Sequence, residues 1–159
     1  MKSLRNLILI GQLLPLLLVH TPSAAAEVTV PFTGAFEGSE TGITEFPTRY
    51  IFGDVGGTAS HLGRFTLHYE FVVDLLTISG SGTAALVAAN GDRLYAEVTG
   101  QATVVEPGYL SIVEIYTLTD GDGRFTGASG GFTLTRALEQ STGITSGSFE
   151  GTLVLPKGK

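Results

Sequence analysis

From Val28 onward, apolar side chains recur at every second position, and this alternation constrains the fold more than any other feature of the chain. No apolar pattern with the helical period exceeds two turns after residue 26. The segments with strand periodicity are rich in Val, Thr, Phe and Gly, residues typical of strands and their turns. The pattern predicts eight strands: Val28–Glu37, Arg49–Phe52, Thr58–Asp74, Ile78–Ala89, Arg93–Val104, Tyr109–Thr119, Arg124–Arg136 and Ile144–Leu155.

Short turns between these segments predict antiparallel pairing of consecutive strands. Asn90-Gly91 has the residues that a two-residue hairpin turn requires, and Glu106-Pro107-Gly108 and Gly121-Asp122-Gly123 mark two more turns. Eight such strands can close into a single antiparallel barrel that is filled by side chains or holds one small ligand. The segment Ser39 to Gly57 is expected to cross one mouth of the barrel irregularly, either as a functional lid or as a passive connection.

The first 26 residues have the composition of a secretory signal peptide. Lys2 and Arg5 form a positive start, an apolar stretch of about 13 residues follows, and Ala24-Ala25-Ala26 provides a small-residue cleavage site. The apolar stretch is shorter than the roughly 20 residues of a membrane-spanning helix. We therefore expect cleavage after Ala26, a β-barrel domain over 27–159 that is not inserted in a membrane, and a secreted or periplasmic location.

Charge and cysteine content exclude several classes of function. Removing Lys2 and Arg5 from the nine basic residues leaves seven against fifteen acidic ones, a balance that repels nucleic acid. The chain has no cysteine, so disulfides, thiolate nucleophiles and thiolate metal sites are excluded. No cofactor is expected.

The alternation also predicts which polar groups face the barrel interior. On 58–74 the more apolar face carries His61, Phe65 and Tyr69, and on 109–119 the bulkier face carries Glu114 and Tyr116. A carboxylate among apolar neighbours finds a partner or is kept protonated, so Glu114 is the candidate acid or base. The other four residues are the candidate ligand contacts. Arg136 is a potential ion partner of Glu114, but its position at a predicted strand end favours a solvated side chain.

Three further motifs do not support a site. His61 and His68 are seven residues apart on one predicted strand and point to opposite faces, so they cannot bind one metal ion. Gly127-Ala128-Ser129-Gly130-Gly131 matches the hydrolase string G-x-S-x-G but lies between strands, where no helix follows. Asp120-Gly121-Asp122-Gly123 lacks the later acidic ligands of a calcium loop. No metal site is expected.

The stretch Thr119 to Gly131 resembles the GGTGxFxGAxG stretch of the allene oxide cyclase-like barrels, a group that includes plant dirigent proteins and many secreted bacterial proteins. The similarity is strongest over Ile112 to Phe132 and weaker over 61–65 and 148–152. It implies an eight-stranded barrel, often oligomeric, that binds a hydrophobic or phenolic small molecule. In some members the barrel steers cyclisation or coupling by its shape, which requires few ionisable groups.

Two functions remain open on these grounds. The first is an exported barrel that binds a small, largely apolar molecule and acts as a cofactor-independent isomerase or cyclase through Glu114. The alternative is a non-catalytic secreted or envelope protein whose outer face or long loop contacts another macromolecule. A lumen packed solid by phenylalanines would favour the alternative, and an open cavity containing Glu114 would favour the first.

Overall fold

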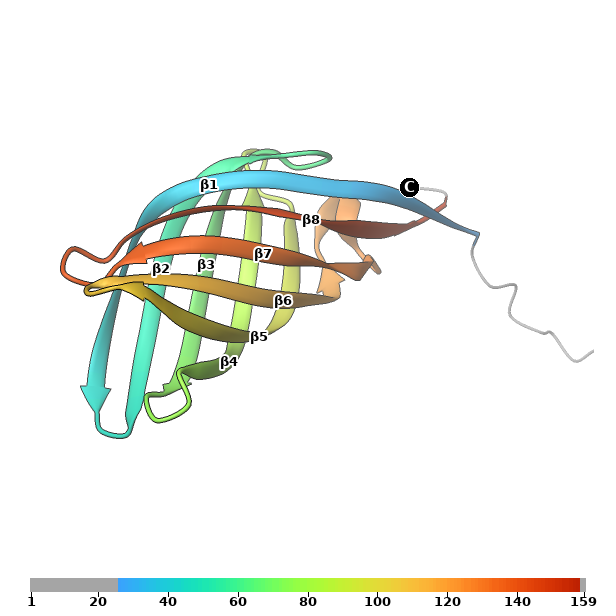
Figure 1. Ribbon diagram of the computed structural model, residues 1–159. Helices are drawn as coiled ribbons and strands as arrows, with labels where there is room; N and C mark the ends of the chain where they lie inside the picture. Colours follow the sequence, from blue (N-terminus) through green and yellow to red (C-terminus); the bar gives the residue numbers. More distant parts are fainter. Residues whose placement is uncertain (1–25, 158–159) are drawn as a thin grey trace, which may run out of the picture.

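A computed structural model of the chain describes residues 26–157 and shows a closed barrel (Figure 1). Each strand pairs antiparallel with its neighbour in sequence, and β1 pairs with β8 to close the barrel. The elements are β1 Glu27–Glu45, β2 Thr48–Ala59, β3 Gly63–Asp74, β4 Ser79–Ala88, β5 Arg93–Glu106, β6 Tyr109–Gly121, η1 Gly123–Phe125, β7 Ser129–Glu139 and β8 Ile144–Pro156. The prediction of an all-β, eight-stranded antiparallel barrel is confirmed. The predicted signal peptide lies almost entirely outside the described residues.

The two ends of the barrel differ in what covers them. The β1–β2, β3–β4, β5–β6 and β7–β8 hairpins lie at one end, on the left in Figure 1. The described chain termini and the short 3-10 helix η1 lie at the opposite end. Phe125 of η1 and the following Ala128 are buried there, so the β6–β7 connection covers this end of the lumen.

The segment Ser39 to Gly57 forms no irregular lid, and that prediction is wrong. β1 continues to Glu45, β2 begins at Thr48, and the two strands pair from Gly34↔Ala59 to Glu45↔Thr48. Inward side chains alternate along β2 through Ile51, Gly53 and Val55. The glycines in this segment had concealed the alternation, because an inward glycine carries no apolar side chain.

Two other strand boundaries differ from the prediction. The expected strand over 58–74 is interrupted by the β2–β3 hairpin, where His61 and Gly63 both have positive φ. The expected strand beginning at Arg124 starts only at Ser129, because η1 occupies Gly123–Phe125. The first error arises at a turn that lacks a proline or an Asn-Gly pair. The second arises because the β6–β7 connection extends to residue 128, beyond the predicted turn at Gly121-Asp122-Gly123.

Phenylalanine rings fill the half of the lumen nearer η1, called here the packed half. The rings of Phe132 and Phe149 have centroids 4.6 Å apart, and Phe32 lies 5.4 Å from Phe132 and 5.2 Å from Phe149. Leu94 and Leu153 are completely buried in the same core. The inward orientation predicted for the phenylalanines is therefore confirmed.

Candidate functional site in the barrel lumen

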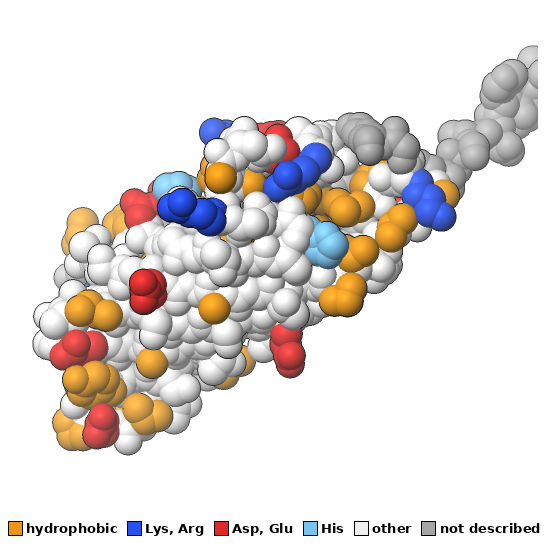
Figure 2. All heavy atoms as spheres, turned by 90° about the horizontal axis from the view of Figure 1, so that it is seen from above, with side chains coloured by type: hydrophobic (Ala, Val, Ile, Leu, Met, Phe, Trp, Pro, Cys, Tyr) orange, Lys and Arg blue, Asp and Glu red, His pale blue; other side chains and the backbone are white. Residues whose placement is uncertain are grey.

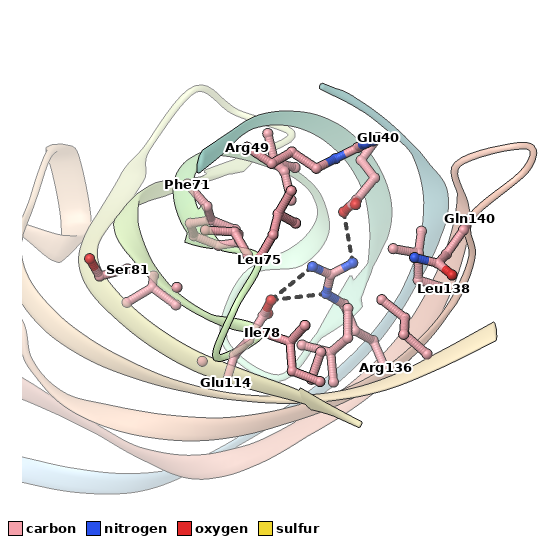
Figure 3. A pocket seen from close by; sticks show the side chains of 18 of the residues that line it. Glu40, Arg49, Phe71, Leu75, Ile78, Ser81, Glu114, Arg136, Leu138 and Gln140 are labelled. Atoms are coloured by element: carbon pink, nitrogen blue, oxygen red, sulfur yellow. Dashed lines mark hydrogen bonds and ion pairs between the residues drawn. The ribbon is translucent and has the colours of Figure 1, made fainter. Parts of the chain in front are cut away.

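The lumen nearer the four hairpins, called here the open half, contains a cavity of about 210 Å³. Most of its lining is apolar and comes from seven strands and the β3–β4 and β7–β8 turns (Figure 3). Ile51, Val98 and Ile112 are representative of this lining. The charged lining residues are Glu40, Arg49, Glu114 and Arg136.

Arg136 joins two carboxylates inside the barrel. Its Nη1 donates to Glu40 Oε2 at 2.8 Å, and its Nε and Nη2 lie 3.0 and 2.9 Å from Glu114 Oε1 (Figure 3). These three residues are called here the charged cluster. The exposed fraction is 5% for Glu40, 3% for Glu114 and 4% for Arg136. A buried charge is costly unless it is paired and hydrogen-bonded, and the cluster satisfies both conditions.

Three hydroxyl groups form hydrogen bonds to the charged cluster. Tyr69 donates to Glu40 Oε2 at 2.9 Å, and Tyr116 donates to Glu114 Oε2 at 3.2 Å. Thr145 accepts from Arg136 Nη1 at 3.2 Å and donates to the backbone carbonyl of Ala137. The carboxylates are thus held from two strands each, which fixes their orientation toward Arg136.

Register between strands places an inward glycine beside each of the three members of the charged cluster. Glu40 on β1 is opposite Gly53 on β2, which is opposite Tyr69 on β3. A Cβ at Gly53 would collide with the Tyr69 ring, so the glycine lets this ring lie across β2 and reach Glu40. The backbone N–H of Glu40 also donates to the carbonyl of Gly143 at 2.9 Å, which anchors β1 where it leaves β8.

The same arrangement recurs at the other two members of the cluster. Gly100 on β5 is opposite Glu114 on β6, and a Cβ there would lie 2.9 Å from Glu114 Cγ. Gly147 on β8 is opposite Arg136 on β7, and a Cβ there would lie 2.7 Å from Arg136 Cβ. Small residues on one strand therefore make room for long polar side chains on the next.

The electrostatics of the cluster keep its partners in fixed protonation states. Burial raises the pKa of Tyr69 and Tyr116 above the usual range of a phenol, and the neighbouring carboxylates Glu40 and Glu114 raise it further, while Arg136 opposes the rise. Burial alone would lower the pKa of Arg136, but Glu114 and Glu40 outweigh burial and raise it above its usual range. Both tyrosines are therefore neutral donors and Arg136 is a permanent cation.

The predicted site residues do not all reach the cavity. Glu114, Tyr69 and Tyr116 are all buried in the lumen, as the alternation predicts. Only Glu114 lines the cavity, and the two tyrosines reach it indirectly, through their hydrogen bonds to the carboxylates. Phe65 is buried but packs against Phe149 in the packed half, away from the cavity. The inward position predicted for His61 is wrong: it lies exposed in the β2–β3 turn, and Leu62 is buried instead.

Sequence reasoning missed Glu40 and misplaced Arg136. Glu40 lies in the segment expected to be a loop, and Arg136 was expected to be solvated at a strand end, whereas β7 continues to Glu139 and buries it. The alternation Phe32, Gly34, Phe36, Gly38, Glu40 could have identified Glu40, if glycine is counted as an inward residue. The alternation through Phe132 and Leu134 could have identified Arg136 in the same way.

Two features are absent from residues 26–157. No group of three or more His, Asp or Glu side chains is arranged to hold a metal ion. No helix there has the length and hydropathy to cross a membrane. His68, expected on the outer face, lies there beside Asp54.

Comparison with solved structures finds the same barrel in proteins of very different sequence. The pterocarpan synthase dirigent protein GePTS1 aligns with a TM-score of 0.65 and 13% identity, covering 86% of this chain and 96% of its own. A second one, PsPTS1, aligns with a TM-score of 0.62 and 11% identity, covering 82% and 97%. No model of a known family matches the sequence, and no curated protein matches it significantly. The chain therefore has the barrel fold of the dirigent proteins.

Proposed function

We propose that the protein binds one small, largely apolar molecule in the open half of its lumen. The cavity of about 210 Å³, whose lining is mostly apolar with a few polar and charged groups, carries this proposal. Apolar cavities of about 150 Å³ bind benzene, so this one has room for a ligand of one or two rings. Ligand sites of this kind combine an apolar wall with a few fixed polar groups, which is the composition found here.

The similar structures support a ring-containing ligand. Both are named as pterocarpan synthases, and we extend to this chain only the chemical class of a small hydrophobic or phenolic molecule. We further propose that residues 1–26 direct export and are removed, so that binding occurs in the periplasm or outside the cell. Mass spectrometry of the exported protein tests this: a chain that begins at Glu27 is expected, and a retained N-terminus would contradict export by cleavage.

The binding proposal is tested by filling the cavity. Ala102 lines the cavity on β5, and Thr99 is exposed on the outer face of the same strand. Protein purified from its native source is expected to carry a small molecule that mass spectrometry detects. The Ala102→Phe variant should no longer carry this small molecule, whereas the Thr99→Phe variant should still carry it. Equal ligand content in both variants would contradict a lumen site.

The finer proposal is a cofactor-independent isomerase or cyclase. Glu114 is the proposed acid or base. Tyr69 and Tyr116 do not line the cavity, so in this proposal they orient the two carboxylates and not the ligand itself. Both oxygens of Glu114 are engaged, Oε1 by Arg136 and Oε2 by Tyr116, whereas Glu40 has one oxygen without a partner. Glu40 is therefore the second candidate. Glu114→Gln and Glu40→Gln should be assayed separately on the captured ligand; turnover that survives both changes would show that neither is the acid or base.

The alternative function, contact with another macromolecule or a second copy, has one observation in its favour. Ile43, Tyr50 and Val72 form an exposed row across β1, β2 and β3. Figure 2 shows hydrophobic and acidic side chains gathered at the hairpin end of the molecule. If this row is a contact between copies, Ile43→Lys with Val72→Lys should lower the mass measured by light scattering. A monomer before and after the change would remove homo-oligomerisation from this alternative.

A further inference from the structure

One carboxylate oxygen in the charged cluster has no partner. Both hydrogen bonds to Glu40, from Tyr69 and from Arg136, go to Oε2. Within residues 26–157 no fully buried side-chain oxygen or nitrogen lacks a hydrogen-bond partner. Since Glu40 lines the cavity, its Oε1 must be reached from the cavity. An ionised carboxylate only accepts hydrogen bonds, so Oε1 can accept one from a donor group in the cavity.

The cluster also carries one formal negative charge in excess. Two carboxylates, Glu40 and Glu114, face the single guanidinium of Arg136. All three groups are nearly excluded from water, so their fields are less screened than those at the surface. An anionic group of a ligand placed beside Glu40 would be repelled and would also lose its hydration.

We propose that Glu40 is the specificity-determining residue of the lumen: its Oε1 accepts a hydrogen bond from a hydroxyl or ammonium group on an apolar ligand, and the excess negative charge excludes carboxylates. This inference rests on the proposed function, because it concerns the ligand of the same cavity. Glu40 selects the ligand by its charge and its donor group, whereas the apolar wall selects it by size.

Arg49 is the charged lining residue outside the cluster, and its position defines a competing binding mode. It lies near the start of β2, half-buried, and donates to Thr44 Oγ1 at 3.3 Å. A ligand carboxylate could pair with Arg49 while its apolar body enters the lumen. The test must therefore distinguish an anion held by Arg49 from a donor held by Glu40.

Four probes that share a naphthalene body provide this test: 2-naphthylmethanol, 2-naphthylmethylammonium, 2-naphthoate and 2-methylnaphthalene. The chain has no tryptophan, so naphthalene fluorescence can be followed over a weak protein background. A hydrogen bond to a charged acceptor is worth enough to change affinity by about tenfold or more. The alcohol and the ammonium probe should therefore each bind at least about tenfold more tightly than the carboxylate and the hydrocarbon.

Glu40→Gln separates this effect from cavity shape. The amide keeps the size of the side chain but removes the excess charge, so the ammonium probe should lose about tenfold in affinity and the carboxylate should gain relative to the alcohol. Glu37→Gln, on the outward face of the same strand, should leave all four affinities unchanged. Thermal unfolding confirms that each variant is folded.

The outcomes distinguish this inference from the proposed function. If the hydrocarbon and the carboxylate bind the wild-type protein as tightly as the alcohol, the lumen site stands and the role of Glu40 is wrong. If 2-naphthoate binds tightly and Arg49→Met abolishes that binding, carboxylate ligands pair with Arg49. The proposed exclusion of carboxylates by Glu40 is then also wrong. If none of the four probes binds, the lumen site itself is contradicted for ligands of this size.

Discussion

The packed and open halves of the lumen are built from the same strands but differ in the residues that point inward. In the packed half, Phe32, Phe132 and Phe149 lie with ring centroids 4.6 to 5.4 Å apart and leave little space. In the open half, inward positions on β4 and β5 carry Gly80, Gly100 and Ala102, and a cavity results. The comparison teaches that alternation defines the barrel, whereas the size of the inward residues defines the site.

The largest expected effect comes from removing the cation of the open half. Arg136→Met leaves Glu40 and Glu114 buried without a counter-charge, and such a change costs about 3–5 kcal/mol of the free energy of unfolding. Urea denaturation measures this. Arg64→Met, at an exposed position of β3, should change stability by less than about 0.5 kcal/mol. Equal effects of the two substitutions would mean that the cluster contributes nothing to stability.

A similar loss is expected in the packed half, but without loss of binding. Phe149→Ala leaves a cavity among three neighbouring rings and should cost about 3–5 kcal/mol. Affinity for 2-naphthylmethanol should stay within about twofold of wild type, since Phe149 does not line the open-half cavity. Phe46→Ala, at a residue 73% exposed, is the matched control for stability. Abolished binding in a folded Phe149→Ala variant would show that the two halves are not independent.

Alkaline pH should act on the two buried tyrosines that donate to the charged cluster, Tyr69 and Tyr116. Their pKa is raised in the folded state by burial, so the unfolded chain releases these protons first as pH rises above about 10. The contribution of these raised pKa values to the free energy of unfolding is therefore complete below that pH. Above it, the free energy of unfolding falls by about 1.4 kcal/mol per pH unit for each tyrosine. Urea denaturation at several alkaline pH values measures this slope, which Tyr116→Phe should make shallower. An unchanged slope in this variant would contradict the raised pKa.

The smallest effect separates two inward alanines on the same strand. Ala96 is buried in the hydrophobic core, so Ala96→Leu should overpack and cost about 1–3 kcal/mol. Ala102 lines the cavity, so Ala102→Leu should be close to neutral in stability and should weaken ligand binding. Thermal unfolding of the pair gives the comparison. Equal destabilisation by both would show that the cavity is not available to side chains.

The sequence was sufficient to predict the barrel and part of the site. Period-2 alternation and turn residues located the eight strands. The same alternation of inward and outward positions placed Glu114, Tyr69 and Tyr116 in the lumen. The rest depended on information that alternation does not carry. Glu40 lies in a strand whose inward positions include glycines, and its partner Arg136 is 96 positions away along the chain. His61 was misplaced because the alternation of inward and outward side chains is interrupted at a hairpin turn.

Methyl-resolved NMR during titration with 2-naphthylmethanol tests the central claim, that the open half holds the ligand, most directly. Ile51, Val98 and Ile112 line the cavity, whereas Leu94 and Leu153 lie in the core outside it. The account predicts saturable shifts at the first three residues and little change at the two leucines. Saturable binding with shifts confined to the leucines, or to outer-face residues such as Ile43, would contradict it.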